Sequence, residues 1–406
     1  MSHPSAATLS ESEVAVPAGH GLRRAAGVVF VLGAICLAAS ILWGFGEDSV
    51  RARFFPAYLT AYAYFLSLSL GALVFVLIQW VTKAGWSVTV RRLAENAMGV
   101  MPLLVVLFVP LLFGLHELFH WTHADAVAHD PMLTQKAPYL NVTFFLVRAA
   151  IYFVAWTALA LWFRAQSVRQ DSTGDHALTR RMQLVSGPAI FAYAFTVTFA
   201  AFDWLMSLDP HWYSTIFGGY FFAGSLMSAL SLMAVVLVLL KGAGFLGAGL
   251  TREHLHDVGK LTFAFVIFWA YLAFSQFMLI WYANIPEETA FFKERLAGDW
   301  RGVSVALLVG HFALPFFYLM SRHVKRLPAL LLLGSVYLLV LHFVDVFWLV
   351  QPAFQPGDPH FGALELTCVL GVGGTWLGAF LWLVTRVRLV PVRDPRLPEA
   401  LAFENF

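Results

Sequence analysis

Six ionisable side chains lie inside long apolar runs of this sequence or at the ends of those runs. An ionisable group in hydrocarbon costs several kcal/mol unless it faces a partner or water, so each one is a candidate functional residue. Histidine exchanges its proton near neutral pH, and a neighbouring carboxylate can pass that proton on. Together these residue types predict a proton path. The six are Arg148, Asp203, His311, His342, Asp345 and Glu365.

The positions of these residues in their runs predict how deeply they lie in a membrane. Arg148, His311 and His342 are each eight residues from the outer end of a run, which places them about 12 Å below the outer surface. Asp345 is one helical turn shallower than His342 and shares its helix face, because the two are three residues apart. Asp203 and Glu365 lie at the outer ends. We therefore expect the titratable groups in the outer half and almost none in the inner half.

Each group also has a purely structural interpretation. Arg148 could pair with Asp203 and hold two helices together, in place of a role in proton transfer. His311, His342 and Asp345 could form a satisfied network between helices, because a neutral histidine is cheaper to bury than a carboxylate. The sequence leaves both alternatives open, since a structural network and a conducting one use the same residues.

A further polar string closes the third apolar run at its outer end. It contains His116, Glu117 and His120, and His123 follows. Because His116 and His120 are four residues apart, they would share one face of a helix, and a metal site is one interpretation. We expect instead a polar turn at the membrane interface beneath a partner subunit, with no metal.

Ten apolar runs must position these residues, each near the ~20 residues that a membrane-spanning helix needs. The chain is 60% hydrophobic and only 12% charged, which would expose too much apolar surface in water. The sequence therefore predicts an all-α integral membrane protein with ten transmembrane helices. The runs are 25–45, 57–80, 97–115, 140–164, 187–206, 215–240, 258–282, 303–320, 328–350 and 363–385.

Charge between the runs predicts the topology. With the N-terminus inside, most of the 26 lysines and arginines fall on the inner side, so both termini are expected in the cytoplasm. Residues 1–22 are polar and are predicted to be a cytoplasmic tail without a cleaved signal peptide, either mobile or held by a partner. Residues 23–390 form the membrane domain and 391–406 a second cytoplasmic tail. A net charge of +2 argues against a nucleic-acid partner.

A weak internal repeat relates helices 2–5 to helices 6–9. Helix 5 ends in Phe202-Asp203-Trp204 and helix 9 ends in Val344-Asp345-Val346-Phe347-Trp348, so each set carries an aspartate near the same place. We expect two four-helix bundles flanked by helices 1 and 10.

The cysteines limit the redox chemistry of the chain. Cys36 and Cys368 both fall inside runs, and the sequence has no C-x-x-C-H motif. It therefore cannot hold an iron–sulfur cluster or a covalently attached haem c by itself.

Nearly the whole chain resembles the NrfD/PsrC-like membrane subunits, and most closely the F subunit of alternative complex III. Beside the ten helices, three strings carry the resemblance: His116-Glu117-Leu118-Phe119-His120-Trp121, Asp203-Trp204-Leu205-Met206-Ser207-Leu208-Asp209-Pro210 and Tyr282-Ala283-Asn284-Ile285-Pro286-Glu287-Glu288.

The resemblance implies a subunit of a quinol-oxidising complex in the bacterial inner (cytoplasmic) membrane. Its implied partners are a sister NrfD-like membrane subunit, a periplasmic iron–sulfur subunit and haem c subunits, which carry electrons from menaquinol or a similar quinol to a periplasmic acceptor. In that family the quinol site is better supported in the sister subunit. This chain would hold no covalent cofactor. Quinone and lipid are its implied ligands, and the residues named above are candidates for a proton path or a quinone pocket.

Two other functions are left open by the residues. His311 and His342 lie at matching depth on consecutive helices and could be the axial ligands of a b-type haem. The repeat and the buried charges would also suit a secondary transporter, although transporter repeats are more often inverted.

Overall fold

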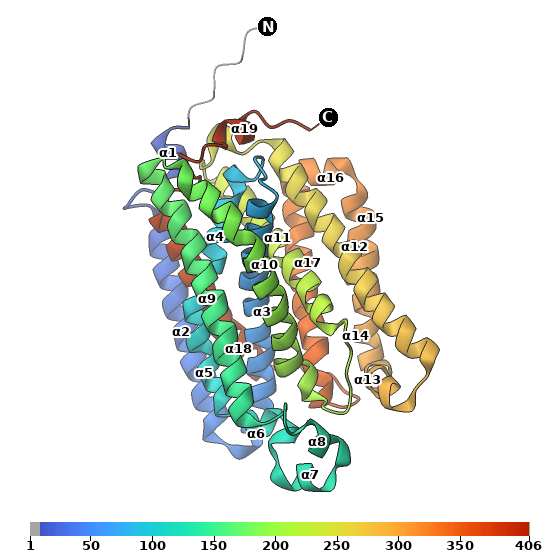
Figure 1. Cartoon of the computed structure of the whole chain (residues 1–406). Coiled ribbons are helices and arrows are strands. Elements are labelled where there is room, and N and C mark those ends of the chain that lie inside the picture. Colours follow the sequence, from blue (N-terminus) through green and yellow to red (C-terminus); the bar gives the residue numbers. More distant parts are fainter. Residues whose placement is uncertain (1–8, 406) are drawn as a thin grey trace.

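The computed structural model describes residues 9–405, except for the side chain of Asp48. This part of the chain is helical and contains no strand. Ten helical stretches are long and apolar enough to cross a membrane, and they run side by side along one axis (Figure 1). The chain is thus an all-α, multi-pass membrane protein, as predicted. Both described chain ends lie at one end of the bundle, named here the terminal end; the opposite end, which carries α7, α8 and α13, is named the α7 end.

The spans and the short helices between them have the following bounds. The spans are α2 (Gly21–Gly46), α3 (Asp48–Val81), α4 with α5 (Val88–Met98 and Met101–Leu112), α9 (Val142–Thr173), α10 (His176–Trp204), α11 (Phe217–Gly242), α12 (Arg252–Ala283), α14 with α15 (Trp300–Ala306 and Leu314–Met320), α17 (Pro328–Val350) and α18 (Ala363–Arg386). The short helices are α1 (Glu11–Val14), α6 (Leu115–Leu118), α7 (Ala124–His129), α8 (Pro131–Lys136), α13 (Pro286–Leu296), α16 (Arg322–Arg326) and α19 (Leu397–Leu401).

Local sequence signals set several of these ends. Asn141 caps α9 by accepting from the backbone N–H of Phe144, and Asp175 caps α10 by accepting from that of Ala177. Gly174 ends α9 at φ +64°, a conformation that glycine adopts without a steric penalty. Helices α9 and α10 therefore extend well beyond the predicted runs and nearly meet at this turn.

The two predicted four-helix bundles are present. Helices α3, α4 with α5, α9 and α10 pack together as the first bundle, and α11, α12, α14 with α15, and α17 as the second. Helices α2 and α18 pack closely on one another and on α3. In α3, 89% of the most apolar stretch is buried, against 17% in α2, so α3 is central and α2 peripheral.

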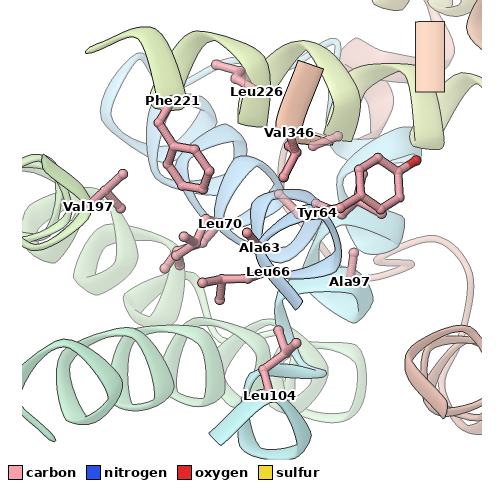
Figure 2. Close-up of a cluster of buried hydrophobic side chains, with 14 of the residues drawn as sticks. Ala63, Tyr64, Leu66, Leu70, Ala97, Leu104, Val197, Phe221, Leu226 and Val346 are labelled. Atoms are coloured by element: carbon pink, nitrogen blue, oxygen red, sulfur yellow. The ribbon is translucent and has the colours of Figure 1, made fainter. Parts of the chain in front are cut away.

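The bundles meet along α3 and α11. At Gly71 a Cβ atom would lie 1.9 Å from the carbonyl oxygen of Ser225, so only glycine permits this crossing. Apolar side chains fill the surrounding space (Figure 2): Ala63, Leu66 and Leu70 of α3, Leu104 of α5, Val197 of α10, and Phe221 and Leu226 of α11.

Residues 9–16 of the predicted N-terminal tail are held by the chain itself. The carbonyl oxygen of Glu13 accepts from the backbone N–H of Leu246 at 2.8 Å, and that of Val14 accepts from Leu389 at 2.7 Å. The N-terminal segment is thereby tied to the α11–α12 connection and to the C-terminal segment. Residues 1–8 of the predicted tail lie outside the described residues.

Candidate functional site

Six buried side chains from five helical segments meet where α3 packs against the second bundle. We name this group the histidine–aspartate site. Each of its members is at most 4% exposed. They are Ser67 of α3, Tyr220 of α11, Trp269 of α12, His311 of the π-helical segment Leu307–Ala313, and His342 and Asp345 of α17.

The carboxylate of Asp345 accepts two hydrogen bonds, and no lysine or arginine of the described part of the chain forms an ion pair with it. The Tyr220 hydroxyl donates to Oδ1, and the Trp269 indole N–H donates to Oδ2 at 3.1 Å. Among the described residues its one ion-pair candidate is His342, with Nδ1 3.8 Å from Oδ2. Burial without a fixed cation favours the protonated form of a carboxyl group. The two neutral donors, Tyr220 and Trp269, offset part of the cost of burying the carboxylate.

The imidazole of His342 has one satisfied and one free nitrogen. Its Nε2 lies 2.9 Å from the Ser67 hydroxyl, and its Nδ1 has no hydrogen-bond partner within residues 9–405. The 3.8 Å gap to Asp345 is too long for a hydrogen bond, and a small movement of either side chain would bring the two atoms within hydrogen-bond distance. Gly224 of α11 leaves room for the ring, since a Cβ there would lie 2.9 Å from Cε1 and 3.2 Å from Nδ1.

His311 adds a second imidazole with unused hydrogen-bonding capacity. Neither of its ring nitrogens has a hydrogen-bond partner in the part of the chain that the structure describes, although the residue is completely buried. Its ring centroid lies 4.2 Å from that of Trp269 and 6.2 Å from that of His342. The π-helical segment that carries it is a local widening of the helix of a kind that occurs often at functional sites.

The corresponding position of the first bundle holds a closed ion pair. Arg148 of α9 donates through Nε and through Nη2 to the carboxylate of Asp203 of α10, at 2.7 and 2.8 Å. Tyr152 donates to the same carboxylate at 2.7 Å, and the guanidinium lies 3.9 Å from the ring centre of Tyr139. This geometry favours the structural interpretation of Arg148 and Asp203, in which they join α9 to α10.

The remaining predicted site residues lie outside both clusters. Glu365, at the start of α18, pairs with Arg53 at 3.1 Å and accepts from the backbone N–H of Gly362. Glu117 pairs with Arg51 at 2.6 Å, and His116 lies 3.1 Å from the hydroxyl of Thr122.

The string from His116 to His120 has the H-E-x-x-H spacing of zinc proteases. In those enzymes both histidines lie on one helix, where they bind the same metal ion. Helix α6 ends at Leu118, so His120 belongs to a separate turn, and Glu117 is occupied by Arg51. No three histidine, cysteine, aspartate or glutamate side chains gather as a metal site in the part of the chain that the structure describes.

The prediction of an inner half almost without titratable groups is wrong. Helix α4 begins at Val88 instead of near residue 97, and its charged first turns are completely buried. Arg91 pairs with Glu95 and Asp394 at 3.1 and 2.7 Å, while Arg92 pairs with Glu95 and Asp171 at 2.9 and 2.7 Å. These five residues are named the terminal-end network. The i, i+3 and i, i+4 spacing of Arg91, Arg92 and Glu95 is the one sequence signal that could have revealed it.

Arg295 is a buried cation that the sequence reasoning missed. It lies on α13 and donates to the carbonyl oxygens of Trp348 and Leu349, in the last turn of α17, at 3.2 and 3.0 Å. Burial lowers the pKa of Arg295 to about 9, so the guanidinium keeps its charge at neutral pH. A cation at a helix C-terminus stabilises the partial negative charge there. Arg295 therefore fixes the end of the helix that carries Asp345.

Comparison with known proteins adds no relative to this description, because neither a family model nor a curated protein matches the sequence.

Proposed function

We propose that this chain is a membrane subunit of a quinol-oxidising electron-transfer complex of the alternative complex III type, and that its histidine–aspartate site relays protons. One observation carries the relay. Asp345 is a buried carboxylate without a fixed cation, and it lies beside His342, a histidine with an unpartnered ring nitrogen. This combination suits a group that gains and loses a proton, because no permanent counter-charge holds the carboxylate in one protonation state.

In the proposed transfer, Oδ2 of protonated Asp345 gives its proton to Nδ1 of His342. The carboxylate left behind keeps the hydrogen bonds from Tyr220 and Trp269. His311 provides a second imidazole beside Trp269, and among the described residues neither of its ring nitrogens has a hydrogen-bond partner. The transfer leaves a carboxylate on Asp345 and an imidazolium on His342, and return of the proton restores both groups without a change of fold.

The two bundles divide the work in this proposal. In chain order, Arg148 and Asp203 occupy the third and fourth helices of the first bundle, and His311 and Asp345 those of the second. Where the first bundle has a permanent cation, the second has a titratable imidazole. The first bundle is therefore the scaffold and the second the proton-handling part.

The membership of the complex is inferred from the sequence strings around Asp203 and Asn284. In the proposed assembly the α7 end faces the periplasm of the bacterial inner membrane, and both chain termini face the cytoplasm. A sister membrane subunit, an iron–sulfur subunit and haem c subunits carry the electrons from menaquinol or a similar quinol. This chain supports that reaction by handling the protons that quinol oxidation releases.

The test measures proton release per electron in liposomes that contain the whole purified complex, with quinol turnover recorded in parallel. Asp345→Asn and His342→Gln should abolish coupled release while the complex stays assembled. Tyr220→Phe should weaken release, because Asp345 loses one of its donors. Its matched control is Tyr152→Phe, which removes the equivalent donor from Asp203 but leaves the ion pair with Arg148. Unchanged stoichiometry and turnover in Asp345→Asn would overturn the relay.

A further inference from the structure

One contact to His342 comes from the other bundle. Ser67 lies on α3, and its hydroxyl oxygen is 2.9 Å from Nε2 of His342 on α17. Ser67 is completely buried and His342 is 1% exposed, so water does not compete for this contact. The bond crosses the seam between the two bundles at the histidine–aspartate site.

The direction of this hydrogen bond follows from the second contact of Ser67. A serine hydroxyl has a single proton to donate. Ser67 donates it to the backbone carbonyl oxygen of Tyr64 at 2.7 Å, and a carbonyl oxygen can only accept. Toward His342 the hydroxyl is then an acceptor, so Nε2 must carry the hydrogen. In the neutral ring this leaves Nδ1 as a bare lone pair.

The lone pair on Nδ1 is the feature that the relay needs. Nδ1 faces Oδ2 of Asp345 at 3.8 Å and has no other partner. In the opposite tautomer Nδ1 would carry a hydrogen and could not accept a proton from the carboxyl group. Tyr64 supports the arrangement, since its ring packs beside His342 with 5.6 Å between centroids and its hydroxyl donates to the carbonyl of Leu339 on α17.

We propose that Ser67 is a positioning residue that fixes His342 in the Nε2–H tautomer, so that its basic nitrogen faces Asp345. The inference rests on the proposed function, because it assigns to the first bundle the task of orienting the proton acceptor of the second. The role is the one that outer-shell partners have at metal and catalytic histidines, where the bond made by one ring nitrogen sets the state of the other.

The experiment is solid-state NMR of the whole complex in lipid, with 15N-labelled histidine and at a pH where His342 is neutral. Subtracting the spectrum of His342→Gln isolates the two ring nitrogens of His342. We expect a protonated Nε2 and a bare Nδ1 in the wild type and in Ser67→Thr, which keeps the hydroxyl. Ser67→Ala should give a mixture of tautomers or the opposite one. A protonated Nδ1 in the wild type, or an unchanged Nε2–H in Ser67→Ala, would overturn the assignment.

A matched control separates this effect from damage to the fold. Ser69 is also completely buried on α3, but it donates to the carbonyl of Ala97 and accepts from the Trp376 indole, without touching His342. Ser69→Ala should leave the His342 tautomer as in the wild type. If Ser67→Ala does not assemble, Ser67→Cys, with a weaker acceptor, should shift the tautomer in the same direction.

Proton release then distinguishes the inference from the function on which it rests. Ser67→Ala should reduce proton release per electron almost as much as Asp345→Asn does, and Ser67→Thr should release as many protons per electron as the wild type. A changed tautomer with unchanged proton release would support the role of Ser67 but overturn the relay. An unchanged tautomer with reduced release would overturn the role of Ser67 and leave the relay standing.

Discussion

Arg148 and Asp203 form a two-pronged ion pair that is almost completely shielded from solvent and crosses from α9 to α10. Every strong hydrogen-bonding atom of the carboxylate is used, because Tyr152 donates to it as well. The pair therefore neutralises two charges that neither helix could bury alone.

Asp203→Asn should destabilise the protein by about 3–5 kcal/mol, since it leaves the Arg148 guanidinium buried without its counter-charge. The measurement is the thermal unfolding of the purified complex, read from the loss of helical circular dichroism. The double variant Arg148→Met with Asp203→Leu removes both charges and should recover much of the loss. If Asp203→Asn were as stable as the wild type, the pair would not hold α9 to α10.

Gly224→Ala should damage the histidine–aspartate site. The new Cβ would lie 2.9 Å from a ring carbon of His342, which Ser67 holds on its other side, so the ring must shift. We expect a cost of about 1–3 kcal/mol from overpacking, together with reduced proton release. The matched control is Gly219→Ala on the same helix, where the nearest atom would be a Leu272 methyl at 3.6 Å, an ordinary contact. Equal effects at both glycines would contradict this account.

Asp394→Asn should release the C-terminal segment from the terminal-end network. Arg91 holds Asp394 at 2.7 Å, and both side chains are at most 2% exposed. For every 1.4 kcal/mol by which this attachment is weakened, trypsin cleavage after Arg393 and Arg396 should become about tenfold faster. Glu399→Gln removes an exposed ion pair with Arg396 and should change the cleavage rate little. Identical rates in the two variants would show that Asp394 does not anchor the segment.

The contact between Asp130 and His211 should fail in acid. The hydrogen bond from His211 holds the pKa of the Asp130 carboxyl below its ordinary value of about 3.9. A lowered pKa in the folded state contributes stability above the unfolded pKa, and this stability is lost as the pH falls through the folded value. Pepsin cleavage in α7 and α8 should therefore increase as the pH drops below about 4.

His211→Ala is the control for that pH dependence. It should raise pepsin cleavage of α7 and α8 already at pH values where the wild type is protected, and it should flatten the increase in acid. A wild-type profile without any rise, or the same rise in His211→Ala, would remove Asp130 and His211 as its cause.

The sequence predicted those features of the fold and of the site that are determined within a single helix. Apolar runs gave the ten spans, and the spacing of His342 and Asp345 put them on one face of α17. Tyr220 and Trp269 could not be found in this way, because their contacts to Asp345 join helices that are distant in sequence. No sequence pattern around His311 predicts the π-helical segment.

The terminal-end network was missed for a different reason. Arg91, Arg92 and Glu95 each lower the mean hydropathy of this segment, so the sequence predicts a loop there. In the structure their charges cancel within one helix and against Asp171 and Asp394, so the helix continues through them. The hydropathy of a single segment does not indicate that its charges pair with residues on other helices.

The crossing at Gly71 has a mechanical consequence. Because the backbone of α11 occupies the place that a side chain on α3 would need, the two bundles touch backbone to backbone at Gly71, and any side chain there would push them apart. Rocking of the two repeats, as in alternating access, would have to break this backbone contact between α3 and α11.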